Sequence, residues 1–331
     1  MAHITHTTHT YHLIDDAPGD ARLSVLDSDQ PYAIKGQTLT LECQCNDHGN
    51  PAAHTFIWTH NGRRVESVSV AENHLLRVGP ADVHTRGDYA CAAINTVGQG
   101  RWANLWLDVK TPPRLVHGLE PTLGSLANRS LTMSCRVECH PTCAVQWFRN
   151  NDSLPPITDP LTDYYYHVES VEHQLDERNG AFGSLTSYLH VHNSTALNDH
   201  DVITCACDGN GVGPGVRSSL VYRHEYPPHD VKVSVARLEL LEGDPIGEDK
   251  IYCTASANPT ANYYWTHASN TAHILAVGRH LTFNTTGSTG AGTGGTGGGA
   301  GGVTRDQSGN YTCVVTNRHG QAQAHVAIIV Q

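Results

Sequence analysis

Cysteine and histidine are the residue types of this chain with the most distinctive chemistry. The 331 residues include ten cysteines and 23 histidines, which can hold metal ions or, for cysteine, form disulfide bonds. Cys139 with Cys143, and Cys205 with Cys207, have spacings loosely like those of zinc ligands. The CxxC pair typical of structural zinc sites is absent from the sequence. We therefore expect no metal site.

The histidines follow one regular pattern, at the N-terminus, where they recur at every third residue: His3, His6, His9 and His12. In a polyproline II conformation they would share one face and could hold a borderline divalent metal. We expect instead a disordered polar leader over residues 1–19, and no cofactor. Other histidines, expected in loops and on solvent-exposed faces, include His48, His54, His60, His84, His167 and His200.

Catalytic motifs do not emerge from the sequence. Serine, histidine and aspartate are abundant, but no nucleophile elbow, metal-binding helix or phosphate loop stands in a strand–turn–helix context. The glycine-rich stretch 287–302 stands between an expected strand at 280–283 and the turn before Tyr311, whereas a nucleotide-binding loop needs a strand before it, a helix after it and fixed spacing. We therefore interpret it as a flexible insertion in a surface loop. We expect a protein that is not an enzyme.

Charge and apolar content narrow the function classes further. The chain has 21 Lys and Arg against 32 Asp and Glu, a net charge of −11, which argues against nucleic-acid binding. Hydrophobic residues make up 39%, enough for packed cores. The apolar runs are too short to span a bilayer, and the first residues do not form a secretory signal peptide.

One order of residues, cysteine–tryptophan–cysteine, occurs three times along the chain. The triplets are Cys43, Trp58 and Cys91, then Cys135, Trp147 and Cys205, then Cys253, Trp265 and Cys313. Each first cysteine ends a segment with period-two alternation, which predicts a half-buried strand with the cysteine pointing inward. Tyr89 and Tyr311 stand two residues before a second cysteine, and turn-forming 95–98 and 317–320 follow. The pattern predicts a repeated β-domain.

Paired prolines mark the expected boundaries of the repeats. Pro112-Pro113 and Pro227-Pro228 are unable to continue a central strand, so we expect short, semi-rigid links there. The predicted domains are residues 20–111, 112–226 and 227–331. The second repeat has the longest cysteine spacing, and residues 151–184 supply either a long connection or an additional edge hairpin.

The repeated constellation resembles the immunoglobulin domain, and the first copy resembles its I-type. The resemblance covers roughly residues 20–331 and implies an all-β fold of three tandem immunoglobulin-like β-sandwiches in an elongated array. In that family an inter-sheet disulfide packs on a buried tryptophan, beside a tyrosine corner. It implies disulfides Cys43–Cys91, Cys135–Cys205 and Cys253–Cys313, core residues Trp58, Trp147 and Trp265, and corner residues Tyr89 and Tyr311. Ile203 replaces the tyrosine in the second copy.

Four cysteines are left over by this framework. In the immunoglobulin fold the second and sixth strands run toward the same end, which places Cys207 near the loop of Cys139 and Cys143. We therefore expect a disulfide from Cys207 to Cys139 or Cys143, with zinc disfavoured because Cys205 is already assigned. Cys45 is expected to be a buried free thiol, with an intermolecular disulfide as the alternative.

Glycosylation motifs point to the secretory route. The pattern N-x-S/T occurs at Asn128, Asn151, Asn193, Asn284 and Asn310. Together with the expected disulfides it predicts the extracellular face of the plasma membrane, with signal peptide and membrane span outside this chain, or a secreted protein as the alternative.

The third repeat allows a finer comparison. Residues 226–231, 253–259 and 308–313 resemble domains of nephrin-like, sidestep-like and siglec-like cell-surface proteins. The resemblance implies an adhesion or recognition receptor ectodomain that binds another cell-surface immunoglobulin-domain protein, homophilically or heterophilically. A secreted immune-recognition protein and the extracellular part of a receptor tyrosine kinase or phosphatase are the alternatives. Trp102 and Trp106 lie on one side near the last strand of the first repeat. They either pack against the core or neighbouring loops, or form an exposed patch for a partner.

Overall fold

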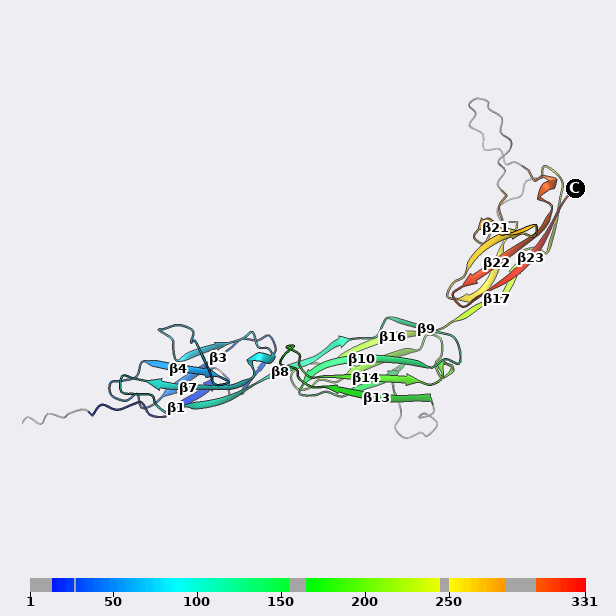
Figure 1. Ribbon diagram of the computed structural model, residues 1–331. Helices are drawn as coiled ribbons and strands as arrows, with labels where there is room; N and C mark the ends of the chain where they lie inside the picture. The colour runs from blue at the N-terminus through cyan, green and yellow to red at the C-terminus, as the bar shows by residue number, and fades with distance from the viewer. Residues whose placement is uncertain (1–13, 27, 155–164, 245–249, 284–301) are drawn as a thin grey trace, which may run out of the picture. The chain divides into compact units, whose positions relative to one another are not determined.

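The computed structural model describes residues 14–26, 28–154, 165–244, 250–283 and 302–331 (Figure 1). Strands make up most of its regular structure, with three short 3-10 helices, η1 (Val83–Thr85), η2 (Ser194–Ala196) and η3 (Arg305–Gln307). The expected all-β fold is confirmed. Most of the leader, nearly all of the glycine-rich insertion and Asn284 lie outside the described residues.

The chain divides into two compact units, of which the first comprises Met1–Pro121, Thr132–Val191 and Val202–Leu220. Its strands before residue 120 are β1 (Ala21–Val25), β2 (Tyr32–Ile34), β3 (Leu39–Cys45), β4 (Thr55–His60), β5 (Arg63–Val65), β6 (Leu75–Val78), β7 (Gly87–Ile94) and β8 (Ala103–His117). Those after it are β10 (Leu131–His140), β11 (Val145–Arg149), β12 (Asp152–Leu154), β13 (Tyr166–His173), β14 (Ser184–Val191), β15 (Val202–Cys207) and β16 (Val216–His224), of which β10 and β16 overlap the second unit. The sheet orders are β1-β3-β6, β13-β14-β10-β8-β7-β4-β5 and β12-β11-β15-β16-β9, where β9 (Thr122–Ser125) belongs to the second unit.

The second unit comprises Thr122–Leu131, His192–Asp201 and Val221–Gln331. Its strands are β9 (Thr122–Ser125), β17 (Tyr226–Val233), β18 (Arg237–Leu240), β19 (Cys253–Asn258), β20 (Asn262–His267), β21 (Asn270–Val277), β22 (Gly309–Asn317) and β23 (Gly320–Val330). They form the sheets β17-β19 and β18-β23-β22-β20-β21, while β9 pairs in parallel with the end of β16.

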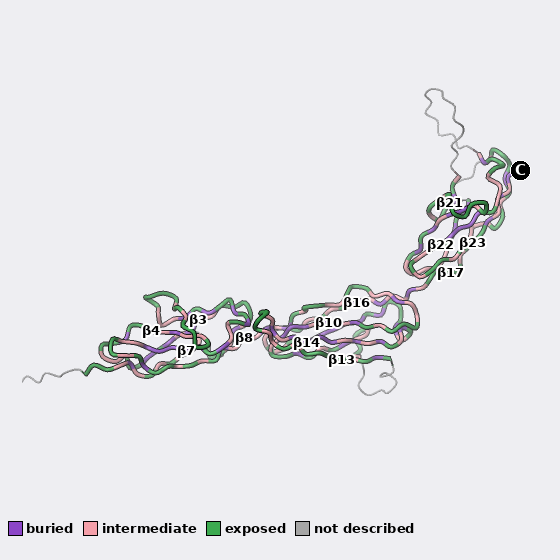
Figure 2. Tube along the Cα trace, viewed as in Figure 1, coloured by how far each residue is buried: buried purple, intermediate pink, exposed green. Residues whose placement is uncertain are grey.

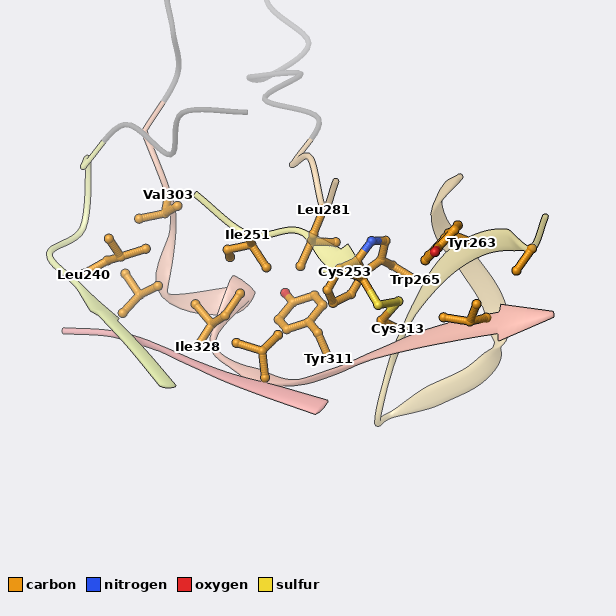
Figure 3. Packing of buried hydrophobic residues seen from close by; sticks show 14 residues of the cluster. Leu240, Ile251, Cys253, Tyr263, Trp265, Leu281, Val303, Tyr311, Cys313 and Ile328 are labelled. Carbon is orange, nitrogen blue, oxygen red and sulfur yellow. A yellow bond between two sulfur atoms is a disulfide. The ribbon is translucent and has the colours of Figure 1, made fainter. Parts of the chain in front are cut away.

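Each cysteine–tryptophan–cysteine triplet converges in a core. The structure joins Cys43 to Cys91, Cys135 to Cys205 and Cys253 to Cys313. In every triplet the tryptophan lies directly opposite the second cysteine on the neighbouring strand, and its side chain is fully buried. Figure 3 shows the third case, with the indole of Trp265 beside the disulfide.

The tyrosine corners close the first and third cores. Tyr89 donates its hydroxyl to the Thr85 carbonyl oxygen at 2.9 Å, and Tyr311 donates to that of Gln307 at 2.8 Å. Burial, with a smaller effect of the Asp82 charge, raises the pKa of Tyr89 to about 12, and burial raises the pKa of Tyr311. Ile203, fully buried, occupies the matching position of the second core.

The expectation that the paired prolines interrupt the strands is wrong. Pro112-Pro113 lies inside β8, and Pro227-Pro228 lies inside β17. Between its pairs with His140 and Glu138, β8 has one more residue than β10, and β17 has the same excess against β19. A β-bulge leaves a residue outside the ladder, so it accommodates residues that lack an N–H.

The expected bond of Cys207 is also wrong. Cys139 is bonded to Cys143, because the turn between them brings their Cα atoms to 6.1 Å, within disulfide range. Cys207 is a buried free thiol whose Sγ donates to the Asp208 carbonyl oxygen, and burial, followed by the Asp208 charge, raises its pKa. Cys45 is buried and free, in line with expectation. Of the two alternatives for residues 151–184, the edge hairpin fits, since β13 pairs with β14 along eight residues.

One asparagine per repeat ties the turn after the second cysteine to two other segments. The Nδ2 of Asn95 donates to the carbonyl oxygens of Asp16 at 2.7 Å and Pro51 at 2.8 Å. In the same way, Asn210 donates to the carbonyl oxygens of Thr111 and Pro141. Asn317 donates to those of Tyr226 and Pro259. The Oδ1 of Asn95 also accepts from the backbone of the turn, at Val97 and Gly98.

We expect Asn95→Ala to lower the free energy of unfolding by about 1–3 kcal/mol, since it removes these hydrogen bonds and leaves carbonyl groups without their donor. Chemical denaturation of the full chain measures the change. Asn104→Ala, at an exposed position of the same domain, is the control and should change stability by less than about 0.5 kcal/mol. Equal effects of the two variants would contradict the role of the Asn95 amide.

Candidate functional site

The outward face of the sheet β8-β7-β4-β5 is the candidate site. Successive residues of a strand point to opposite faces, and Leu107, Cys91 and Trp58 point into the core. Their neighbours therefore point outward. We call the outward set the tryptophan face, which consists of Trp102, Asn104 and Trp106 on or just before β8, Asp88, Ala90 and Ala92 on β7, and Ile57 and Thr59 on β4.

The tryptophan face carries two large apolar side chains in contact with solvent. Trp102 is 40% exposed and Trp106 is 54% exposed, so neither side chain is packed into the core. Trp106 lies opposite Asp88, and Asn104 lies opposite the buried Ala90. Figure 2 shows buried and exposed residues alternating along the strands of this region. The two exposed indoles thus flank Asn104, which faces a small alanine on β7.

A groove continues this face at its other side. It has a volume of about 600 Å³ and lies between β4, β5 and residues 66–73, with Ile57 and Arg64 among its lining residues. Val68 and Val70 in its wall are exposed. The wall is held in place by two hydrogen bonds, from Trp58 Nε1 to the Asn73 carbonyl oxygen at 2.8 Å and from Asn73 Nδ2 to that of His54 at 2.9 Å.

Below the tryptophans, β8 is fixed by charged groups. Asp108 Oδ1 accepts from Arg86 Nε at 2.9 Å, and its Oδ2 lies 3.1 Å from His140 Nε2. Burial opposes the ionisation of Asp108, but the hydrogen bonds and charges of His140 and Arg86 outweigh it, so the pKa of Asp108 lies below its ordinary value. Nearby, the buried Glu138 carboxylate accepts from Lys35 Nζ at 2.7 Å.

An apolar contact adds to these ion pairs in fixing the end of β8. Phe182, from the loop between β13 and β14, is buried against Val83 and Val109. The ammonium group of Lys35 lies 4.8 Å above the Phe182 ring. The end of β8 is therefore anchored on residues of the second repeat, which gives the tryptophan face a fixed support.

The lowered pKa of Asp108 predicts a pH dependence. Its ionised form is the one that the fold stabilises, so its contribution is complete above the ordinary pKa near 3.8 and is lost as the pH falls through the lower folded-state value. We expect Asp108→Asn to destabilise the chain at pH 7, and the difference from the natural chain to shrink toward zero below about pH 3. Denaturation at a series of pH values measures it. Asp88→Asn, at an exposed position, is the control, and a pH-independent difference for Asp108→Asn would contradict the prediction.

The predicted glycosylation sites lie outside the first repeat. Asn128, Asn151 and Asn310 are exposed. Asn193 is half-buried, its Oδ1 accepts from the Thr195 backbone at 2.9 Å, and its Nδ2 lies 3.3 Å from Asn128 Oδ1. Residues 1–111 contain no N-x-S/T sequence, so no such site adjoins the tryptophan face along the chain.

Two further observations concern other site types. Within the described residues, no group of three or more histidine, cysteine, aspartate or glutamate side chains is arranged to hold a metal ion. Among the same residues no helix is both long and apolar enough to cross a membrane.

Comparison with known proteins assigns a domain type to part of this chain. Residues 24–95 match the model of the immunoglobulin domain. The chain is 27% identical over 120 residues to lachesin of Schistocerca americana, which covers 36% of this chain and 34% of lachesin. It is 23% identical over 302 residues to human hemicentin-1, which covers 90% of this chain and 5% of hemicentin-1. The chain thus spans about a third or less of these relatives.

Among solved structures, the full ectodomain of mouse nectin-like molecule 4, with domains Ig1 to Ig3, superposes with a TM-score of 0.44. The superposition covers 92% of this chain and 97% of that chain, with 19% identical residues.

Proposed function

We propose, starting from an immunoglobulin domain at residues 24–95, that this chain belongs to a cell-surface recognition protein and binds another immunoglobulin-domain protein through the tryptophan face. The observation that carries the proposal is the exposure of Trp102 and Trp106 on one face of a fixed sheet. Tryptophan is enriched among the residues that dominate binding energy. A standard interface buries about 800 Å² per partner, which several strands of one sheet face can supply.

The placement of glycosylation motifs supports this choice of face. All five lie after residue 111, so the first repeat would be free of N-linked glycans while the others carry them. A bulky, hydrated glycan shields the surface near it. The face that is left uncovered is the one with two exposed indoles.

The charges near the tryptophan face indicate which charges a partner would carry. Asp88 lies beside Trp106, and Arg64 and Glu66 line the groove. Charges of both signs are compatible with a partner that carries the complementary arrangement, including a second copy of this chain. The partner would supply an apolar surface for the two indoles and opposite charges at its margin.

The wider setting follows from the same residues. We propose three immunoglobulin-like domains, one around each disulfide and tryptophan, in a chain that is not an enzyme. Disulfides and glycosylation motifs suit an oxidising, extracellular location. The resemblance to nephrin-like, sidestep-like or siglec-like proteins remains a prediction from the residues of the third repeat.

Replacing Trp106 with glutamate tests the binding face. We expect Trp106→Glu to weaken partner binding by about 30-fold or more, because hot-spot residues contribute about 2 kcal/mol or more. The chain, displayed on beads as a multivalent probe, would be screened against cells that express immunoglobulin-domain ectodomains, including this chain itself. Binding to the same chain would establish a homophilic partner.

The matched control for this test is Val171→Glu, which places the same charge on an exposed residue of β13. It should bind like the natural chain. The proposal fails if Trp102→Glu and Trp106→Glu both fold and bind every partner as the natural chain does.

Glycopeptide mass spectrometry of the chain secreted from animal cells tests its extracellular setting. We expect N-linked glycans on peptides that contain Asn128, Asn151 or Asn310, whose side chains are exposed, and none on peptides from residues 1–111. Treatment with a glycosidase that converts the modified asparagine to aspartate identifies each site. A secreted chain without any glycan would contradict this part of the proposal.

A further inference from the structure

The strand β21 is the unpaired margin of a sheet in the second unit. The sheet order is β18-β23-β22-β20-β21, so among the described residues β21 pairs with β20 on one side only (Figure 1). It is eight residues long, Asn270–Val277, and seven of the eight are exposed. Its free side presents backbone N–H and C=O groups, for which a further β-strand is the natural partner.

Large apolar side chains accompany this open edge. Val277 is 83% exposed and Ile274 is 51% exposed. They lie opposite Tyr264 and Thr266 of β20, which lie two residues apart and therefore on one face of the sheet. Leu275, also exposed, is the extra residue of a register shift between these pairs. An apolar surface and a row of free backbone groups thus coincide on one strand.

Charge distinguishes β21 from comparable edges. Natural proteins place charged residues on edge strands, which discourages pairing with another chain. Two other sheet-end strands are also eight residues long, and both follow this rule: β13 carries Glu169 and Glu172, and β17 carries Asp230 and Lys232. No residue of β21 is Asp, Glu, Lys, Arg or Pro.

We propose that β21 pairs with β21 of a second copy of this chain in an antiparallel, two-fold symmetric arrangement. An uncharged strand can meet its own copy in any register without like charges facing each other, whereas β13, with its two glutamates, can do so in some registers only. A two-fold axis near Leu275 and Ala276 brings Ile274 of each copy next to Val277 of the other. The contact between Ile274 and Val277 then occurs twice, once on each side of the axis, as an isologous interface requires.

The contact is small, which sets the expected affinity. With the axis between Leu275 and Ala276, only residues 274–277 of each β21 lie opposite β21 of the other copy. So short a contact buries less than the roughly 800 Å² per partner of a standard interface, and we therefore expect a dissociation constant of about 1–100 µM. This pairing involves a different domain from the tryptophan face. It therefore stands or falls independently of the proposed function.

Sedimentation equilibrium of the full chain tests the pairing. From about 1 to about 200 µM the average mass should rise from monomer toward dimer. Ile274→Lys combined with Val277→Lys places like charges opposite each other across the two-fold axis, and should raise the dissociation constant at least about tenfold. Leu241→Lys, at an exposed apolar residue of the same unit outside β21, is the matched control and should dimerise like the natural chain.

Cross-linking identifies the strand itself. With Ile274→Cys and Val277→Cys in one chain, oxidation should give a covalent dimer on a non-reducing gel, while Leu241→Cys stays monomeric. Trp106→Glu should leave the dimer unchanged, which separates this contact from the proposed binding face. A chain that stays monomeric up to about 200 µM, or a dimer that survives the two lysines, overturns the proposal.

Discussion

The contact between a tryptophan and the disulfide that it faces is the interaction on which each repeat depends. Trp58, Trp147 and Trp265 each lie across the ladder from the second cysteine of their own triplet. Closing loops of 48 to 70 residues stabilises each fold by about 4 kcal/mol through the entropy of the unfolded chain. The disulfide and the indole together decide which residues of each strand point inward. The outward set, including Trp102 and Trp106, follows from that choice through the two-residue period of a strand.

Much of this arrangement could be predicted from the sequence, because it depends on spacing and alternation. The cysteines, the core tryptophans and Tyr89 with Tyr311 stand at positions that period-two strands bring together. The bond between Cys139 and Cys143 could not be predicted in this way. It depends on how tightly residues 140–142 turn, and strand periodicity carries no information about a turn of that length.

The prolines and the groove show two more limits of sequence reasoning. Pro112-Pro113 lies in a strand because a bulge removes the need for its missing N–H, and bulges depend on the partner strand β10. The groove wall at residues 66–73 is held by Trp58 and Asn73, whose hydrogen bonds join segments that are distant in sequence. The alternation of serine and valine at 67–70 resembles a strand, although the structure places no strand there.

The histidines, which first suggested metal chemistry, have structural roles at several positions. His60 was expected in a loop or on a solvent-exposed face, but it is half-buried in β4 and stacks on Tyr89 with ring centroids 4.3 Å apart. His267 follows its core tryptophan at the same distance in sequence and contacts Tyr311 edge-on, with ring centroids 4.9 Å apart. A flat, half-polar ring suits this position because one side covers the buried tyrosine while ring nitrogens reach polar groups at the rim, as His60 Nε2 does at 3.0 Å from the Arg86 carbonyl oxygen. The repeated packing of histidine on the corner tyrosine thus accounts for two of the histidines without any ligand.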